Sequence, residues 1–205
     1  SNNGMMLWGN LNYQYMEASM GYSSDLSWGS YQNRGWNNAH LITYAESHDE
    51  ERMMYKNLQY GASSGSYNIT NLNTALKRQE LAHCLLLPIP GPKMIWQFGE
   101  LGYDISIEQN GRVGRKPIHW DYYHDSNRRK LLNRYAQMNK LRNENPVFHT
   151  NTFTTSLSGA KKWIKLTNSD MYAVVMVNFN VQSESFTIDF PNTGKWYEFF
   201  TQDSI

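Results

Sequence analysis

Two short apolar runs, each followed by charged or small residues, organise the first half of the chain. Residues 41–45 are mainly apolar and lead into a dense cluster of ionisable residues, which are Glu46, His48, Asp49, Glu50, Glu51 and Arg52. Residues 94–98 follow a turn of glycine and proline and lead into Gly99 and Glu100. Short apolar runs are typical of parallel strands covered on both faces, and functional groups collect after the C-terminal ends of such strands. The pattern therefore predicts two buried strands that carry carboxylates at their ends.

The segments around these runs predict helices. Residues 73–88 repeat apolar positions at helical spacing and end at prolines, so that strand, helix and strand form a βαβ unit with parallel pairing. Residues 4–22 begin apolar and continue as a helix closed by Gly21. Residues 127–142 predict another amphipathic helix, for which Asp125 or the serine after it offers an N-cap.

From Phe148 onward the pattern changes to short alternating runs separated by turns. The candidate strands are residues 152–157, 161–167, 171–179, 184–190 and 195–201. Both faces of the third run are nearly all apolar, which predicts a central strand that pairs with the second run. This half of the chain is therefore expected to form a small antiparallel β unit that packs on the rest.

The composition narrows the classes of partner. The chain has 19 basic and 18 acidic residues, so its charge gives no reason to expect nucleic acid or an anionic membrane as a partner. The sequence shows neither a signal peptide nor an apolar run of membrane length, and the compartment stays open between secreted or periplasmic and cytoplasmic. Cys84 is the single cysteine, which excludes an intrachain disulfide. The histidines lack ligand spacing, so no metal site and no cofactor are expected.

Each candidate site has a structural interpretation beside the functional one. The cluster around His48 and Asp49 would also suit a solvated turn before a helix, where acidic residues are favourable in the first turn. Trp28 and Trp36 lie in a polar loop and would serve either as platforms for sugar rings or as anchors that hold the loop on the domain. Glu100 is a weaker candidate for substrate binding, with bracing of neighbouring loops as its alternative.

The order of these motifs resembles a known family. The residues SHDE after an apolar strand, then a helix, then PGPKMIWQFGELGYD are similar to the last shared motif and eighth-strand region of the α-amylase superfamily, glycoside hydrolase family 13. The Ser-His-Asp-Glu form is most similar to the glucan-branching enzymes, because many amylases carry Asn-His-Asp, and Ser47 departs from that commoner pattern. The resemblance covers about residues 40–145 and extends more loosely over both flanks.

The resemblance implies a fold class and a division of the chain. The expected fold is α/β plus β: the C-terminal portion of a TIM (β/α)₈ barrel in residues 1–147, followed by a small, truncated antiparallel β-sandwich in residues 148–205. A whole barrel takes roughly 250 residues, more than this chain supplies. A partial barrel leaves strand edges and helix faces uncovered, so we expect self-association.

The resemblance also assigns roles. It makes Asp49 the carboxylate that stabilises the transition state and His48 a donor to the same sugar, while the nucleophile and the acid/base come from earlier motifs of the family. The chain is therefore expected to be inactive alone, to need an N-terminal part of the same polypeptide, and to belong to an enzyme that cleaves or transfers α-1,4-glucosidic bonds with retention in starch, glycogen or maltooligosaccharides. Hydrolysis and branching stay open.

Two other classes compete with this assignment. A non-catalytic carbohydrate-binding or scaffolding module would suit the aromatic content of 14% and the β unit. An α/β hydrolase with a nucleophile elbow is disfavoured, because the Gly-x-Ser runs lie in predicted loops rather than between a strand and a helix.

Overall fold

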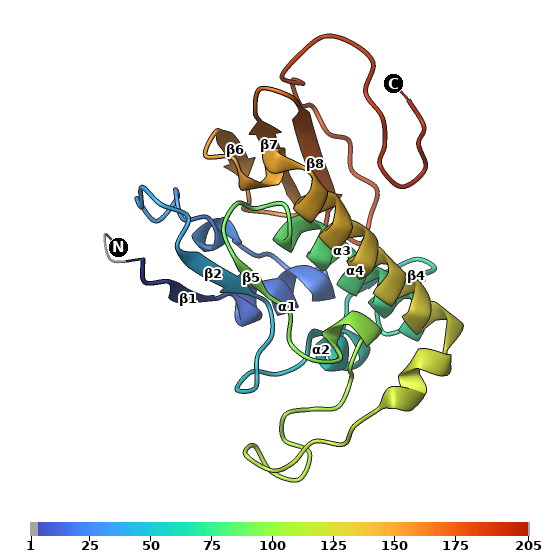
Figure 1. Cartoon of the computed structure of the whole chain (residues 1–205). Coiled ribbons are helices and arrows are strands. Elements are labelled where there is room, and N and C mark those ends of the chain that lie inside the picture. The colour runs from blue at the N-terminus through green and yellow to red at the C-terminus, as the bar shows by residue number, and fades with distance from the viewer. Residues whose placement is uncertain (1–3, 205) are drawn as a thin grey trace.

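The computed structural model describes residues 4–204, and a small parallel sheet lies near one side of the molecule (Figure 1). Its strands are β1 (Leu7–Asn10), β2 (Leu41–Tyr44) and β5 (Lys93–Met94), in the order β1-β2-β5. Both pairings are parallel, as the βαβ pattern predicts. Strand β1 was not predicted from the sequence, because its four residues, which end in glycine and asparagine, show no recognisable alternation of apolar and polar positions.

Helix α1 (Asn12–Met20) connects β1 to β2, and helices α2 (Met53–Tyr60) and α3 (Leu72–Leu86) lie between β2 and β5 along the chain. Helix α4 (Ser126–Glu144) follows β5. The predicted helices over residues 73–88 and 127–142 are confirmed as α3 and α4, which pack side by side (Figure 1). Gly21 ends α1 in the left-handed conformation at φ 91°, and the Asp125 side chain caps α4 by accepting hydrogen bonds from the N–H groups of Asn127 and Arg128.

The remaining short elements are 3₁₀ helices and a hairpin. The 3₁₀ helices are η1 (Ser27–Gly29), η2 (Gly99–Leu101), η3 (Trp120–His124) and η4 (Pro146–His149), and the hairpin pairs β3 (Ser63–Ser64) with β4 (Tyr67–Asn68). The hairpin occupies the polar segment between α2 and α3. No described helix has the length and apolar character needed to cross a membrane.

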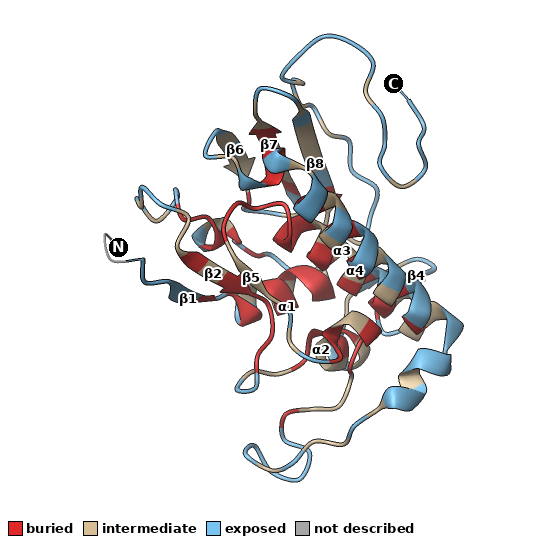
Figure 2. Ribbon diagram, in the orientation of Figure 1, coloured by how far each residue is buried: buried red, intermediate tan, exposed pale blue. Residues whose placement is uncertain are grey.

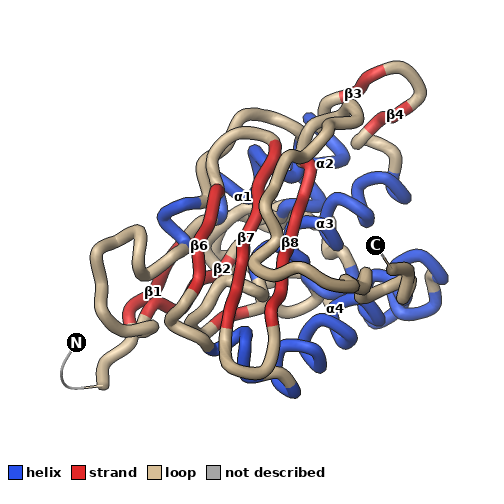
Figure 3. The backbone as a smooth tube through the Cα atoms, turned by 90° about the horizontal axis from the view of Figure 1, so that it is seen from above, coloured by secondary structure: helices blue, strands red, loops and turns tan. Residues whose placement is uncertain are grey.

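A second sheet, antiparallel, covers another side of the helices (Figure 3). Its strands are β6 (Phe153–Ser156), β7 (Lys161–Thr167) and β8 (Tyr172–Asn178), in that order. The predicted pairing of residues 161–167 with residues 171–179 is confirmed. The prediction that residues 171–179 form a central strand is wrong, because β8 lies at the edge of the sheet.

The last two predicted strands are not formed. Residues 184–190 contain no strand, and residues 195–201 contribute only one residue to an isolated bridge, between Tyr197 and Ser204. Alternating apolar residues form a strand only where a partner strand is available, and β8 makes no pairing on its outer edge among the described residues.

One hydrophobic core joins helices α1 and α3 to the antiparallel sheet and reaches residues that directly follow the parallel strands β1 and β2. Buried side chains from α1, α3, β7 and β8 belong to the same cluster, including Tyr15, Leu85, Ile164 and Val177. Figure 2 shows the buried residues concentrated in the helices and strands of the interior, with exposed residues along the outer side of α4 and the C-terminal segment. The antiparallel sheet is therefore packed directly on the helices that follow the parallel strands.

The parallel sheet is covered unevenly. Leu41 and Thr43 of the middle strand are 1% and 0% exposed, whereas Trp8 of the edge strand β1 is 62% exposed and touches Tyr44 edge-on at 5.8 Å between ring centroids. Met5, Met6 and Leu7 beside it are also exposed. The outer edges of β1 and β5 have no strand partner among the described residues.

Arg78 is buried without a carboxylate beside it in any described ion pair. Its side chain is 2% exposed and donates to the carbonyl oxygens of Ser19 at 2.9 Å, Ala18 at 2.7 Å and Phe179 at 2.6 Å. The first two carbonyls lie at the end of α1 and the third follows β8. One guanidinium thus joins the last turn of a helix to the antiparallel sheet.

Lys162 of β7 has a similar structural role, and the Arg78 guanidinium and the Lys162 ammonium lie 5.4 Å and 5.9 Å from the centroid of the Phe179 ring. It is 0% exposed, and its ammonium donates to the carbonyls of Ser24 and Leu157, both at 2.9 Å, and to that of Gly159. Burial lowers the pKa of Lys162 to about 8. The contact fixes the loop after α1 to the turn between β6 and β7.

Candidate active site

The residues predicted to carry the chemistry lie in a loop at the C-terminal end of β2. His48 and Asp49 are both exposed, and His48 Nε2 lies 3.2 Å from Asp49 Oδ2. The ring of Trp96, which follows β5, lies 5.7 Å from the His48 ring between centroids. An imidazole, a carboxylate and an indole ring thus meet where two neighbouring parallel strands end, which is the usual place for ligands in such sheets.

The strand predicted over residues 94–98 is shorter than expected. Only Lys93 and Met94 pair with β2, in the register Thr43 with Lys93 and Tyr44 with Met94. The chain then turns, and Phe98 adopts the left-handed conformation at φ 63° immediately before η2. The parallel arrangement with β2 is confirmed, and the early turn is what directs Trp96 toward His48.

The loop from Ser47 to Arg52 is held by its own polar groups. The Ser47 hydroxyl donates to the Glu50 carboxylate, and Arg52 Nη1 donates to the Ser47 carbonyl. Asn10, at the end of β1, donates its side-chain N–H to Glu50 Oε1. Sequence reasoning did not identify Asn10 as part of the site, although a polar residue at the end of an adjacent parallel strand is a signal that could have found it.

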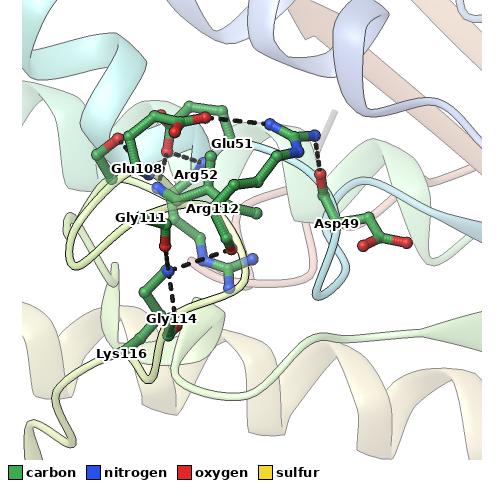
Figure 4. A network of polar contacts seen from close by, with 10 residues as sticks. Asp49, Glu51, Arg52, Glu108, Gly111, Arg112, Gly114 and Lys116 are labelled. Atoms are coloured by element: carbon green, nitrogen blue, oxygen red, sulfur yellow. Dashed lines mark hydrogen bonds and ion pairs between the residues drawn. The ribbon is translucent and has the colours of Figure 1, made fainter.

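A segment far along the chain fastens this loop from outside. Arg112 Nη2 donates to the carbonyl of Asp49, and its Nη1 lies 3.3 Å from Glu108 Oε1 (Figure 4). Glu51 accepts hydrogen bonds from the Ser106 hydroxyl at 2.7 Å and from the Ile107 N–H at 2.9 Å. The predicted excursion over residues 105–123 therefore packs on the candidate site.

This segment is also braced internally. The ammonium of Lys116 donates to the carbonyls of Gly111 at 2.7 Å and Gly114 at 2.8 Å, which closes the tip of the excursion on itself (Figure 4). In the same view the Asp49 carboxylate points away from Arg112, so the arginine holds the main chain and does not compete with His48 for the carboxylate.

Glu100 lies beside the site rather than in it. It is half-buried in η2, and burial raises its pKa above the usual range of a glutamic acid. Burial is also the main cause of the raised pKa of Glu46, to which the charge of Glu100 adds, and the Glu46 carboxylate packs against Gly99 of η2. No described contact joins Glu100 to His48 or Asp49.

The two tryptophans of the long loop are placed elsewhere. Trp36 comes before β2 and Asp49 after it, so they flank opposite ends of the strand. The guanidinium of Arg34 lies 4.9 Å from the ring centroid of Trp28 and 5.6 Å from that of Trp36. Trp28 remains 57% exposed. The structure groups these two rings around Arg34 and does not bring them to His48 and Asp49.

Two other chemistries find little support. Within residues 4–204, no cluster of three or more His, Cys, Asp and Glu side chains could hold a metal ion. Residues 61–65, GASSG, have the spacing of a nucleophile motif, but Ser63 begins the first strand of the β3–β4 hairpin rather than a turn from strand to helix. The exposed imidazole and carboxylate are suited instead to hydrogen bonding with hydroxyl groups and to stabilising positive charge.

Comparison with known proteins gives a clear answer for the fold. No family model matches the sequence, and no curated protein matches it. Among solved structures, AmyP in complex with maltose superposes with a TM-score of 0.66 at 11% identity, over 93% of this chain and 44% of that one. An Anoxybacillus α-amylase gives 0.62 at 17% identity, over 94% and 41%. The type III pullulan hydrolase from Thermococcus kodakarensis gives 0.61 at 18%, over 95% and 33%.

These similarities define the fold. Nearly the whole chain superposes on part of structures that include an α-amylase and a pullulan hydrolase, while it spans less than half of each of those chains. The expectation of an α-amylase type of fold is confirmed at this level. The observed architecture is an α and β arrangement with one small parallel and one small antiparallel sheet.

Proposed function

We propose that the chain is part of an α-glucan-processing enzyme of the α-amylase type, in which Asp49 stabilises the transition state and His48 binds the same sugar. The observation that carries this proposal is the 3.2 Å pair of His48 and Asp49 after β2, within a fold shared with an α-amylase and with AmyP in complex with maltose. The reaction would be hydrolysis or transfer of α-1,4-glucosidic bonds with retention; Ser47 makes the motif most similar to that of branching enzymes and leaves the choice between hydrolysis and branching open.

In this proposal the parallel strands β1, β2 and β5 are the last strands of a (β/α)₈ barrel formed by residues 1–147, and residues 148–205 are a β domain that follows it. Retention requires two carboxyl groups about 5 Å apart across the scissile bond, the nucleophile and the acid/base. In this proposal both come from earlier strands of the barrel, outside this chain. The expected substrates are starch, glycogen and maltooligosaccharides.

The exposed position of the Asp49 carboxylate supports its role. The carboxylate is exposed, next to an imidazole, and its main chain is held by Arg112 from the other side. As positive charge develops on the sugar ring, a carboxylate fixed in advance stabilises the transition state more than the ground state. His48 supplies a hydrogen bond to the sugar rather than a charge of the required sign, so its removal should cost less.

The test uses the longer enzyme that contains this chain, assayed on starch and glycogen. Asp49→Asn should lower kcat by roughly a hundredfold or more, with a much smaller change in KM, and His48→Ala should lower it less. Asp170→Asn is the matched control, because Asp170 is exposed in the turn between β7 and β8. An enzyme carrying Asp49→Asn with the activity of the control would overturn the proposal.

A second candidate is a carbohydrate-binding or scaffolding module without chemistry. The exposed Trp28, held beside Trp36 by Arg34, favours it, because such rings can stack on sugars. This candidate predicts that glucan binding survives Asp49→Asn and is lost on Trp28→Ala, measured by titration calorimetry with maltoheptaose. The enzyme proposal predicts that Asp49→Asn changes turnover.

A further inference from the structure

Glu46 differs from the other acidic residues of the loop that carries Asp49. It is 6% exposed, whereas Asp49 is exposed and Glu50 and Glu51 are half-buried. A carboxylate that is buried loses its hydration and needs partners inside the protein. The partners of Glu46 therefore indicate what it does.

The carboxylate of Glu46 joins the two ends of the loop. Its Oε1 accepts a hydrogen bond of 2.7 Å from the N–H of Met53, the first residue of α2. Glu46 lies two residues after β2 ends, so this bond closes the segment of residues 47–52 at its base. The same N–H has no partner within its helix, because the first N–H groups of a helix lack intrahelical acceptors.

The other carboxylate oxygen of Glu46 packs against the 3₁₀ helix η2, which follows the neighbouring strand β5. A Cβ atom added at Gly99 would lie 2.8 Å from Glu46 Oε2, so η2 lies directly against the carboxylate. Arg52 provides the nearby positive charge, and it also donates to the carbonyl of Ser47 within the loop. Glu46 thus contacts the segments that follow β2, precede α2 and follow β5.

The surroundings of Glu46 act on its pKa in opposite directions, and the net effect is a raised pKa. Burial is the largest effect and raises its pKa, Arg52 and the Met53 N–H lower it, and Glu100 and Glu51 raise it again. An acidic group in this environment is costly to maintain for stability alone, since a buried charge contributes little net stabilisation. Its contribution is better explained by the geometry that it imposes on the loop.

We propose that Glu46 is a positioning residue of the loop of residues 47–52: by closing the base of the loop at Met53 and packing on Gly99, it fixes the direction in which His48 and Asp49 are presented, beside the contacts that hold the outer part of the loop. The inference rests on the proposed function only for its catalytic consequence. The fixed geometry of the loop is a property of this chain and is measurable without any substrate.

The first experiment measures backbone order in the chain itself by NMR relaxation. Wild-type residues 47–50 should have order parameters near about 0.85, and in Glu46→Ala these should fall below about 0.6 while α3 and β7 keep theirs. Glu46→Gln should give intermediate values, because its amide oxygen still accepts from Met53. Glu144→Ala, an exposed position at the end of α4, is the control. Order parameters unchanged in a folded Glu46→Ala chain would overturn the proposal.

A second pair of variants tests the hydrogen bond from the donor side and does not remove the carboxylate. Met53→Pro lacks the N–H, and proline fits the first position of a helix, here after Arg52 with extended φ −79° and ψ 133°. Met53→Ala loses the same buried side chain and keeps the N–H. Higher mobility of residues 47–50 in Met53→Pro than in Met53→Ala supports the proposal, and equal mobility in the two contradicts it.

The catalytic consequence is tested separately in the longer enzyme. Glu46→Gln should lower kcat about tenfold with little change in KM. If Asp49→Asn leaves turnover intact, the proposed function fails while the relaxation result stands. If Asp49→Asn abolishes turnover and Glu46→Ala changes neither order nor kcat, the positioning role alone fails.

Discussion

Replacing Arg78 by methionine should destabilise the chain more than any surface substitution on the same helix. The guanidinium is 2% exposed and donates to the carbonyls of Ser19, Ala18 and Phe179 at 2.6–2.9 Å, with a longer bond of 3.4 Å to Asn180. Methionine fills most of the volume but donates nothing. At least three buried carbonyls would lose their partner.

The size of the effect follows from those carbonyls. Each buried polar group left without a partner costs about 1–3 kcal/mol, and the cost of burying the charge disappears with the arginine. We therefore expect a loss of about 3–5 kcal/mol, which is a large part of the 5–15 kcal/mol typical of a domain. Arg78→Lys keeps the charge but lacks the planar fork, so we expect about half of that loss.

The assay is urea denaturation followed by tryptophan fluorescence, because urea leaves charge interactions unscreened. Lys77→Met is the control, since Lys77 is exposed on α3 beside Arg78, and it should change the free energy of unfolding by less than about 0.5 kcal/mol. If the free energies of unfolding of Arg78→Met and Lys77→Met differ by less than about 1 kcal/mol, the hydrogen bonds from Arg78 to the main chain do not contribute the stability expected of them. The lysine variant gives a graded answer if Arg78→Met fails to fold.

Three further predictions concern other parts of the molecule. Burial lowers the pKa of Lys162 to about 8, so the folded chain binds fewer protons than the unfolded chain above that pH. The free energy of unfolding should therefore rise by about 1–3 kcal/mol between pH 8 and 10. Lys162→Met, measured by urea denaturation at each pH, should lack this rise. Gly102→Ala should cost about 1–3 kcal/mol more than Gly159→Ala in thermal unfolding, because both glycines have positive φ but only at Gly102 would a Cβ meet Leu76, at 2.5 Å; equal losses would exclude a packing effect. The edges of β1 and β5, which have no strand partner within residues 4–204, and the exposed Trp8 should promote self-association, and sedimentation of a clean monomer at micromolar concentration would count against it.

Local patterns were sufficient for much of the fold. Strand β2, helices α3 and α4 and strand β7 lie within a few residues of their predicted bounds, because periodic apolar residues and caps such as Asp125 act over one or two turns. The parallel pairing of β2 with β5 also followed from the predicted helix over residues 73–88, although the connection contains a second helix, α2, that was not predicted. The position of His48 and Asp49 after β2 also followed from these elements, whereas the approach of Trp96 depends on the unpredicted turn after β5.

The features that could not be predicted from the sequence depend on contacts between residues far apart along the chain. Both faces of β8 are apolar, yet it lies at an edge, because the position of a strand in a sheet is decided by which other strands are present. Arg112 holds Asp49 through a main-chain carbonyl, a group that every residue has and that leaves no trace in the sequence. The same reason hides the partners of Arg78 and Lys162.

The hydrogen bonds from buried Arg78 and Lys162 to main-chain carbonyls also affect how the chain unfolds. Arg78 binds carbonyls 60 residues before it and 101 residues after it, and Lys162 binds one 138 residues away. Opening the antiparallel sheet alone would leave a guanidinium and an ammonium stranded in an apolar core, so such partial opening is unfavourable. The slowest-exchanging amides of α1 and of β7 should therefore share one opening free energy, and the two sheets should melt in a single cooperative transition.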